Sequence, residues 1–424
     1  MSRAIFVVNA GSSSIKFKLF RIVGDAIEIV LSGAVDGIGS KPRLKARDHD
    51  GKVLVERTFA VAEISSTAQA QHVVADWLIA QVKDYEIVGI GHRVVHGGPD
   101  YWQPVVVDDG VLAKLETLVS LAPLHLPANL DPIRVLRQRH PDLPQVACFD
   151  TAFHRGHPAL SDRFALPRAL YDEGIRRYGF HGLSYEYVSV ALRKIAPDVA
   201  SGRVVIAHLG SGASACGLRG GRSVDSTMTF SALDGLPMGT RPGSLDPGVL
   251  LYLIEQKGMT PAEVGKMLYH DSGLLGLSGI SNDVRELLAS ESRDAAMAID
   301  YFCLHVAQAI ASLAVSIDGL DGLVFTAGIG ENAPQVRQRV VDYLRWSGLS
   351  IDADANRRNA VRIDAERGNA RIFVIPTDEE RMIALHTLRL LKEQRRTVEL
   401  TAARAQNESM RAYPRFPQIC QSGS

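Results

Sequence analysis

One pattern occurs twice in this chain: an apolar strand, a short tip of small residues and a returning strand. Residues 5–20 read IFVVNAGSSSIKFKLF and residues 203–218 read RVVIAHLGSGASACGL, and aligning them puts Asn9 over His208. Apolar, β-branched runs predict buried strands, and small tip residues let backbone N–H groups surround a bulky anion. Ordinary tight hairpins whose short loops agree by chance are the alternative. The repeat favours one architecture used twice, each copy with a phosphate-binding tip.

Length and charge describe the class of protein. The 424 residues suffice for two or three domains, each with its own core. Lys+Arg 47 and Asp+Glu 47 leave a formal net charge of zero. The chain therefore lacks the basic excess that is typical of proteins that bind nucleic acid or anionic membranes, and we expect neither partner.

Cysteines and apolar segments indicate the compartment. The four cysteines are scattered without CxxC spacing, which favours free thiols in a reducing compartment. No signal-peptide pattern precedes the first strand. The longest apolar helix candidate, residues 295–317, carries Asp300, His305 and Gln308, which favours a buried core helix over a membrane span. We therefore expect a cytoplasmic protein.

Polar residues follow several predicted strands, where α/β sheets bind ligands. Arg93 stands in GHRVVHGG, and a lone arginine beside an apolar strand needs an anion to pair with. We interpret His92 and His96 beside it as structural. Asp150 ends a further buried strand. Arg241 lies in a long Gly/Pro-rich loop, and long loops inside a compact domain are usually functional.

The remaining motifs point to phosphoryl transfer. Residues 328–332 read GIGEN after an apolar strand, a unit suited to the α-phosphate or ribose of a nucleotide. The sequence contains no GxxxxGK[ST] loop, no protein-kinase glycine loop and no GxSxG elbow. It offers Gly-rich anion loops, two isolated arginines, strand-end acids and Lys16 beside the first tip. These parts position a phosphoryl group and neutralise its charge.

The motifs together resemble one family. In chain order they are VNAGSSSIKF, GHRVVHGG, FDTAFH, YGFHG, HLGSGAS, MGTRPG, GIGEN and PTDEE, and this series is similar to the acetate kinase family over roughly residues 3 to 392. The resemblance implies two duplicated actin-like (ribonuclease H-like) α/β domains with a nucleotide cleft between them. It also implies reversible, Mg²⁺-dependent transfer of a phosphoryl group from ATP to acetate, directly and in line, within a homodimer.

The resemblance assigns a role to each matching residue. It implies Asn9 and Glu379 for Mg²⁺, for which Mn²⁺ can substitute. For ATP or ADP it implies Ser12, Ser14, Lys16, His208, Leu209, Gly210, Ser211, Gly212, Asp283, Val284, Arg285, Gly328, Ile329, Gly330, Glu331 and Asn332. For the acyl pocket it implies Arg93, Val95, Leu124, Phe180 and Ala232. For catalysis it implies Arg93, His125, Asp150, His181 and Arg241. A carboxylic acid is already ionised at pH 7, so we expect Asp150 to orient other groups rather than act as a base.

The implied domains are residues 1–150, completed by a C-terminal helix over about 381–395, and residues 151–380. We expect residues 396–424 to form a polar, extended or disordered tail. Two departures from the family's pattern concern the substrates: Ser211 replaces an Asn of the phosphate loop, and Ala232 stands where the acyl pocket usually has a Pro. A propionate or broader short-chain acyl kinase is therefore one alternative, and a nucleotide-binding regulator without turnover is another.

Overall fold

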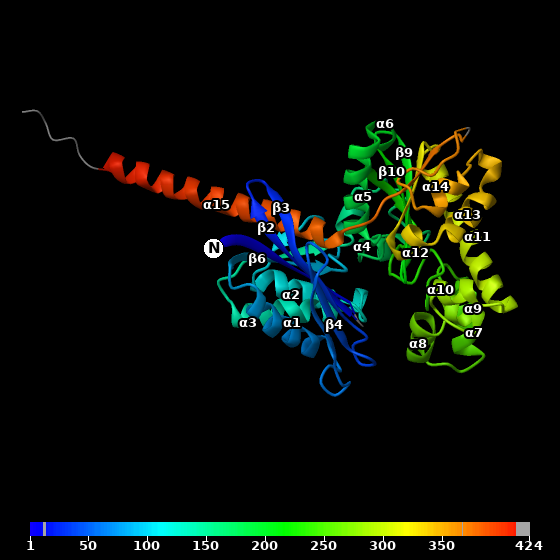
Figure 1. The fold of residues 1–424 in the computed structure, drawn as a ribbon, viewed down its shortest axis with the longest axis horizontal. Coiled ribbons are helices and arrows are strands. Elements are labelled where there is room, and N and C mark those ends of the chain that lie inside the picture. Colours follow the sequence, from blue (N-terminus) through cyan, green and yellow to red (C-terminus); the bar gives the residue numbers. More distant parts are fainter. Residues whose placement is uncertain (12–13, 367, 413–424) are drawn as a thin grey trace, which may run out of the picture.

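The computed structural model describes residues 1–11, 14–366 and 368–412. It contains two β-sheets in two lobes (Figure 1). The first sheet is built from β1 (Ser2–Ala10), β2 (Ser14–Val23), β3 (Ala26–Asp36), β4 (Arg43–Asp48), β5 (Val53–Thr58), β6 (Tyr85–Val94), β7 (Val105–Val106) and β8 (Gln145–Phe149). The second is built from β9 (Arg203–Leu209), β10 (Ala213–Arg219), β11 (Arg222–Ser226), β12 (Gly322–Thr326) and β13 (Arg371–Val374).

Fifteen α-helices are assigned within the described residues. They are α1 (Thr67–Gln81), α2 (Asp109–Thr117), α3 (Leu126–Arg139), α4 (Arg168–Asp172), α5 (Gly182–Ile195), α6 (Pro197–Ala200), α7 (Pro247–Glu255), α8 (Pro261–His270), α9 (Gly273–Ser278), α10 (Val284–Ala289), α11 (Arg293–Ser316), α12 (Ala327–Asn332), α13 (Pro334–Tyr343), α14 (Ala353–Arg357) and α15 (Glu379–Ala412).

The two sheets share one topology, as the repeated hairpin predicts. The strand orders are β5-β4-β3-β2-β1-β6-β8-β7 and β11-β10-β9-β12-β13. In each, a central strand (β1 or β9) has an antiparallel hairpin partner on one side and a parallel strand on the other. Asn9 is paired with Lys16 in the first hairpin and His208 with Ser214 in the second. The prediction of duplicated α/β domains is confirmed.

Helices cover both faces of each central strand, which explains why the strands are apolar throughout rather than alternating. On β1, Phe6 and Val8 pack toward α1, whereas Ile5 and Val7 pack with the apolar side chains of α15. On β9, alternate residues contact α11 and α5 in the same way. Burial on both faces favours continuous runs of Val, Ile and Ala.

The chain leaves the second lobe after β13, and helix α15 begins between the lobes and packs on β1, β6 and β8 of the first (Figure 1). It continues to Ala412, so the expectation of an irregular tail from residue 396 is wrong for residues 396–412, and residues 413–424 lie outside the described part. The physical reason is composition: residues 379–412 contain neither Gly nor Pro and are rich in Leu, Ala, Arg and Glu, all strong helix formers.

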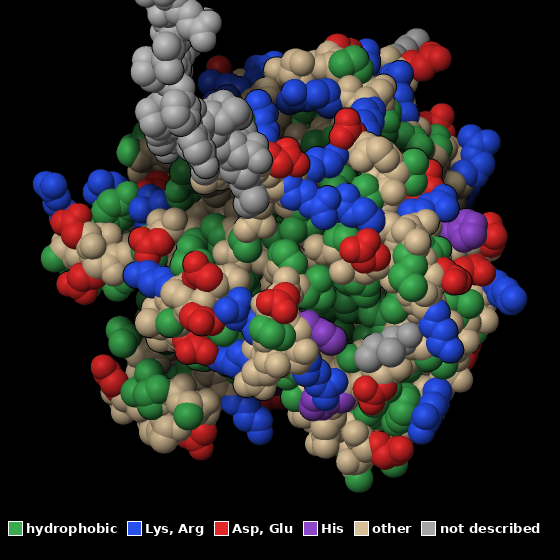
Figure 2. Space-filling model, turned by 90° about the vertical axis from the view of Figure 1, so that its left-hand side faces the viewer, with side chains coloured by type: hydrophobic (Ala, Val, Ile, Leu, Met, Phe, Trp, Pro, Cys, Tyr) green, Lys and Arg blue, Asp and Glu red, His purple; other side chains and the backbone are tan. Residues whose placement is uncertain are grey.

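Helix α11 is long and apolar enough to span a membrane by length and composition alone, and it is the only such helix within the described residues. Its buried side chains, including Phe302, Val306 and Ile310, belong to the core shared with β9. This is the core helix that the sequence predicts. On the face of the molecule shown in Figure 2, acidic and basic side chains are interspersed, in keeping with the balanced charge.

Candidate active site

A cavity of about 500 Å³ lies between the two lobes, where both hairpin tips meet the start of α15. Its lining combines the first half of the chain with the second: Asn9, Gly11, Ser14, Lys16, Arg93, His181, His208, Gly210, Ser211, Gly212, Ala327, Gly328, Glu331, Thr377, Glu379 and Glu380. The strand-end motifs that are far apart in the sequence therefore meet at one place. Polar groups dominate this cavity.

Arg93 is held by an ion pair with Asp150. Its Nε lies 3.0 and 3.1 Å from the two carboxylate oxygens, and its Nη2 contacts one of them as well. The arrangement follows from the fold, because β6 and β8 are parallel neighbours in which Arg93 is paired with Cys148, two residues before Asp150. The prediction that Arg93 pairs with an anion holds, but the anion belongs to the chain itself.

Asn9 lies at the centre of an acidic cluster. Its Nδ2 is 3.2 Å from Glu379 Oε2 and 2.8 Å from Glu380 Oε1, while its Oδ1 is 3.4 Å from Arg93 Nη1. Lys18 contributes a balancing charge, with Nζ 2.6 Å from Asp378 Oδ1 and 3.3 Å from Glu380 Oε2. The start of α15 thus brings three carboxylates to the end of β1.

Burial and ion pairing set the charge of the central groups. Burial lowers the pKa of Arg93, but Asp150 and Glu379 outweigh it and hold that pKa above its usual value. Burial also raises the pKa of Asp150, which Arg93 opposes. For Glu379 burial alone would raise the pKa, but Arg93, His208, Lys16 and the hydrogen bond from Asn9 together outweigh it, and the pKa lies below its usual value. The site therefore keeps a permanent cation beside an ionised Glu379.

His181 faces the cavity as a neutral ring. Burial is the main cause that lowers its pKa well below 6.5, and the ring stacks on His208 with 4.2 Å between centroids. Its backbone has φ of 58°, a left-handed conformation that side chains rarely adopt outside turns and functional sites. The next residue, Gly182, allows this turn, because a Cβ there would lie 2.2 Å from the carbonyl oxygen of Asp150.

A hydrogen-bond chain is the basis on which we assign the proton of His181. Burial raises the pKa of Tyr185 well above 10, so its hydroxyl keeps its proton, and we assign that hydroxyl as the donor to Ser214 Oγ. The Ser214 hydroxyl is then free to donate to His181 Nδ1 at 2.8 Å. The proton of the neutral ring therefore sits on Nε2, which is the nitrogen near Gly212 at the second hairpin tip.

Arg241 reaches the same tip from the long loop. A Cβ at Gly212 would lie 2.7 Å from Arg241 Nη2 and 3.5 Å from His181 Nε2, so the tip passes directly over both groups. Arg241 Nη1 donates to the carbonyl oxygen of Ala232 at 2.7 Å. Burial lowers the pKa of Arg241, and Arg93 adds to that effect; burial and these two arginines also lower the pKa of His125 to about 4.

A second cavity of about 730 Å³ adjoins the first and shares Gly210, Ser211 and Gly328 with it. It is lined by loops and helix starts of the second lobe: Gly210, Ser211, Asn282, Asp283, Val284, Arg285, Leu288, Ala289, Gly328, Ile329, Asn332, Ala333 and Gln335. The Asp283 carboxylate caps α10 by accepting from the backbone N–H of Arg285 at 2.8 Å. The two cavities together form an elongated site with an acidic and cationic end and a less polar end.

Comparison with known proteins identifies the group to which this chain belongs. The sequence profile of the Acetokinase family matches residues 4–385. The chain belongs to the acetokinase family. It is 54% identical to an acetate kinase of Nitrobacter hamburgensis over 92% of this chain and 97% of the relative, and 52% identical to an acetate kinase of Rhizobium meliloti over 92% and 98%.

Solved structures agree with this assignment. A propionate kinase from Francisella tularensis superposes with a TM-score of 0.84 at 37% identity, covering 91% of this chain and 99% of that one. The acetate kinase of Porphyromonas gingivalis superposes with a TM-score of 0.79 at 33% identity, covering 92% and 100%. Membership of the acetokinase family makes this chain a phosphotransferase with a carboxyl group as acceptor, as predicted.

The structure brings most of the residues predicted for the acetokinase site to these two cavities. The first cavity is lined by Lys16, His208, Gly212 and Glu331 and by Asn9, Glu379 and Glu380 of the acidic cluster, and residues 283–285 line the second. His125, Asp150 and Arg241 do not line either cavity. Leu209 is fully buried in the core and Gly330 is buried in α12, so the Leu209 side chain does not face a ligand and Gly330 is not exposed to one. Ser12 lies outside the described residues.

The predicted acyl pocket is only partly assembled. Val95 and Phe180 are buried in one apolar cluster, and Ala232 packs against it. Leu124 has 39% of its surface exposed. As we interpreted them, His92 and His96 are structural: His92 Nε2 is 2.8 Å from Gln145 Oε1, and His96 Nδ1 accepts from the backbone N–H of Gly98.

Sequence reasoning missed several groups that complete the acetokinase site. Ser214 and Tyr185 hold His181, and Ser184 Oγ lies 2.8 Å from both His208 Nδ1 and Thr377 Oγ1. The acidic pair Asp378 and Glu380 flanks Glu379, and the run TDEE was the signal that could have found it. The sequence carries no local signal for the hydroxyl groups of Ser184, Tyr185 and Ser214, because their hydrogen-bond partners lie on other elements of the fold.

Proposed function

We propose that this chain catalyses reversible transfer of the γ-phosphoryl group of ATP to the carboxylate of acetate, giving acetyl phosphate and ADP. The observation that carries the proposal is the joined pair of cavities. One offers loops for a nucleotide. The other is lined by Arg93 and His181, and Arg241 lies beside Gly212 at its second hairpin tip. Such groups stabilise the charge that develops on a phosphoryl group in flight.

Transfer in this proposal is direct. A carboxylate oxygen of acetate attacks the γ-phosphorus in line, the bond from that phosphorus to the β,γ-bridging oxygen breaks, and ADP leaves with the electron pair. No proton needs to move, because acetate is ionised at pH 7. The buried Asp150 supports this reading, since both its oxygens contact Arg93 and it is 0% exposed. Asp150 then orients Arg93 rather than attacking phosphorus itself.

Each further residue has a positioning task. Arg93 and Arg241 hold the substrate carboxylate and the transferring group, and His181 donates from Nε2 to its equatorial oxygens. His125, whose pKa is lowered to about 4 by burial and by the two arginines, donates as a neutral ring from the start of α3. Ser14 and Lys16 face the phosphates from the first hairpin tip. Residues 283–285 and 328–332 hold the nucleoside.

The cluster around Asn9 suits Mg²⁺, which Mn²⁺ can replace. Mg²⁺ prefers oxygen ligands, usually keeps several waters, and binds through one or two carboxylates and the substrate phosphates. Glu379 would supply a carboxylate oxygen and Asn9 an amide oxygen to the ion, and the two side chains lie next to each other, with Asn9 Nδ2 3.2 Å from Glu379 Oε2. When bound, the ion neutralises phosphate charge. Within the described residues no group of three or more His, Cys, Asp or Glu forms a cage for a metal.

A hydroxamate assay tests the proposal. ATP, Mg²⁺ and carboxylates from formate to butyrate are supplied in turn, and the acyl phosphate is trapped. We expect the largest kcat/KM with acetate. A maximum at propionate favours the broader acyl kinase, which the solved propionate kinase at 37% identity and the small Ala232 both suggest. No turnover with any carboxylate while ATP still binds would leave the non-catalytic regulator as the better reading.

We also propose a cytoplasmic homodimer. Helix α7 has no buried residue, yet it is apolar, with Leu251 57% and Tyr252 53% exposed. Such a surface favours a partner, and a second copy of the chain is our candidate. Sedimentation velocity tests it: the wild type should run as a dimer and Leu251→Glu as a monomer. The described cysteines Cys148, Cys216 and Cys303 are unpaired, which supports a reducing compartment.

A further inference from the structure

A third cavity, of about 290 Å³, lies inside the first lobe and is unrelated to the cleft. It is enclosed between α1, α3 and the face of the first sheet opposite α15, and it shares no lining residue with the two cleft cavities. Its walls are almost entirely apolar, with Phe6, Val74, Leu78 and Leu136 among them. Protein interiors seldom leave this much apolar space unfilled.

Three polar side chains line the otherwise apolar cavity, namely Gln71, Arg139 and His140, and Gln71 is the buried one. Gln71 lines the cavity, is only 8% exposed, and has no hydrogen-bond partner among the described residues for either its Oε1 or its Nε2. Burial of an unpaired carboxamide is unfavourable, so buried amides normally have partners. A ligand in the cavity would fill the apolar space and also give the Gln71 carboxamide a hydrogen-bond partner.

The two ends of the cavity differ in charge. α1 leads into β6 and α3 leads into β8, and these strands are parallel, so both helices run in the same direction along the sheet. Gln71 in the first turns of α1 therefore lies at one end, and Arg139 at the end of α3 lies at the other. Arg139 is exposed and forms no salt bridge within the described residues. From Pro132 to Arg139 the helical rise is about 10 Å.

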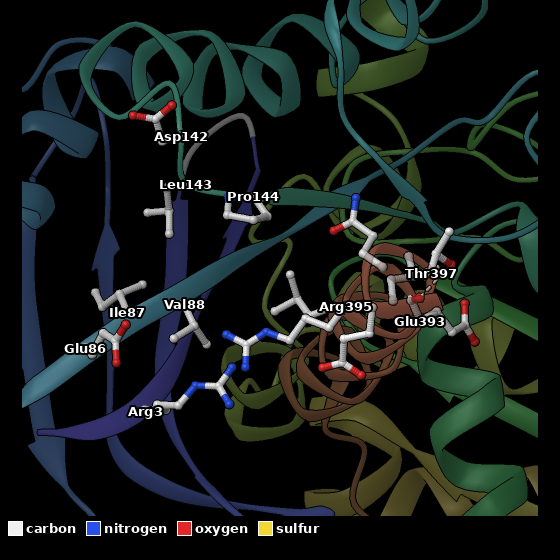
Figure 3. A pocket seen from close by; sticks show the side chains of 14 residues that line it. Arg3, Glu86, Ile87, Val88, Asp142, Leu143, Pro144, Glu393, Arg395 and Thr397 are labelled. Atoms are coloured by element: carbon white, nitrogen blue, oxygen red, sulfur yellow. Dashed lines mark hydrogen bonds between the residues drawn. The ribbon is translucent and has the colours of Figure 1, made fainter. Parts of the chain in front are cut away.

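The outer end is also the accessible one. Ile87 and Leu143 line this cavity and, in addition, the groove of about 910 Å³ between the sheet and α15 that Figure 3 shows. The cavity therefore lies next to a surface opening on the side of Arg139. A ligand that enters from this side places its apolar part inward and leaves an anionic group at the guanidinium.

We propose that this cavity binds a small aromatic carboxylate that carries a hydroxyl group at its far end. The carboxylate pairs with Arg139, the ring lies among the apolar walls, and the hydroxyl group contacts the carboxamide of Gln71. A single ring fits the volume, because an apolar cavity of about 150 Å³ is enough for benzene. A two-carbon side chain between ring and carboxylate gives the ligand a length that suits the roughly 10 Å over which the cavity follows α3 from Pro132 to Arg139.

Isothermal titration of the full chain with three probes tests the assignment. They are 3-(4-hydroxyphenyl)propanoate, 3-phenylpropanoate, which lacks the hydroxyl group, and 4-propylphenol, which lacks the carboxylate. We expect saturable binding of the first, at least tenfold tighter than either of the others. Absence of saturable binding would overturn the proposal. Equal affinity for 3-phenylpropanoate would also overturn it, because Gln71 would then be satisfied by water.

Variants locate the site. Ala75→Phe fills the cavity and should abolish binding, whereas Ala80→Phe, on an exposed position of the same helix, should leave it unchanged. Gln71→Leu should remove the preference for the hydroxyl group, and Arg139→Gln should weaken both carboxylates about tenfold. Kinase turnover of each variant shows that it is folded. Binding that survives in a folded Ala75→Phe variant places the ligand elsewhere and refutes the inference.

Discussion

Replacing Arg93 by alanine should cost this protein both its activity and much of its stability. The substitution leaves the carboxylate of Asp150, which is 0% exposed, without the guanidinium that contacts both its oxygens at 3.0 and 3.1 Å. Removing one partner of a buried ion pair costs about 3–5 kcal/mol. We therefore expect the free energy of unfolding of Arg93→Ala to fall by about that amount.

Arg241→Ala provides the matched comparison. No carboxylate lies within salt-bridge distance of Arg241 among the described residues, and its hydrogen bond is to the carbonyl oxygen of Ala232 at 2.7 Å. Loss of that bond costs about 1.5–3 kcal/mol at most, and relief from burying a cation next to Arg93 offsets part of it. Arg241→Ala should thus lower kcat/KM about a hundredfold or more with a net stability change of about 1 kcal/mol.

Urea unfolding and the hydroxamate assay separate the two effects. The double variant Arg93→Ala, Asp150→Asn should recover about 2 kcal/mol or more of stability, because a neutral amide needs no counter-ion, yet it should remain inactive. If Arg93→Ala is as stable as the wild type, the ion pair does not matter for folding. If either alanine variant keeps near-wild-type kcat/KM, that arginine has no part in transfer.

Three further outcomes follow from single contacts. Ser211→Asn, at the boundary between the two cleft cavities, should tighten ATP binding or speed transfer by adding an amide donor; weaker binding in a titration without faster transfer would mean that the loop is optimised around Ser. Ala232→Pro should shift the propionate-to-acetate ratio of kcat/KM toward acetate by several-fold, because Ala232 packs against the apolar cluster that holds Val95 and Phe180 and a larger residue there leaves less room for an added methylene; an unchanged ratio removes Ala232 from the pocket. Burial lowers the pKa of His154 to about 3 and of His92 to about 4, so these rings are neutral in the folded chain and charged in the unfolded chain below pH 6.5. Stability present above pH 6.5 should be lost as the pH falls toward 3, and His154→Gln should flatten the slope in urea unfolding by up to about 1.4 kcal/mol per pH unit; an unaltered slope would mean that His154 is protonated in the fold.

The sequence predicts the strand-end positions well, because periodicity and glycine placement are local properties. Asn9, Arg93 and Asp150 were each found at the end of an apolar run, and the topology alone brings those ends together. The ion pair of Arg93 was not found, since it depends on the order of strands in the sheet. With β6 and β8 known to be adjacent and parallel, the register of Arg93 with Cys148 makes the contact with Asp150 almost unavoidable.

Other features have no local signal at all. The hydroxyl chain from Tyr185 through Ser214 to His181 joins residues on α5 and β10, and nothing in either segment marks the partner. Gln71 stands in an ordinary amphipathic helix pattern, and only the space around it makes it unusual. Helix propensity, in contrast, is a local signal: the composition of residues 396–412 favours a helix in spite of their polarity.

The duplicated topology places different chemical groups at equivalent positions in the two halves of the chain. Asn9 and His208 occupy the same place, at the end of the central strand before a hairpin tip. Around Asn9 the parallel neighbour β6 brings Arg93, and α15 brings three carboxylates, so this half concentrates charge. Around His208 the neighbours are neutral: Thr326 on β12, the ring of His181 and the hydroxyl group of Ser184. One backbone frame thus presents a charged surface suited to a metal ion and a carboxylate on one side of the cleft. On the other side it presents glycines and neutral donors, with the guanidinium of Arg241 beside the hairpin tip, and this combination suits the close approach of phosphate groups.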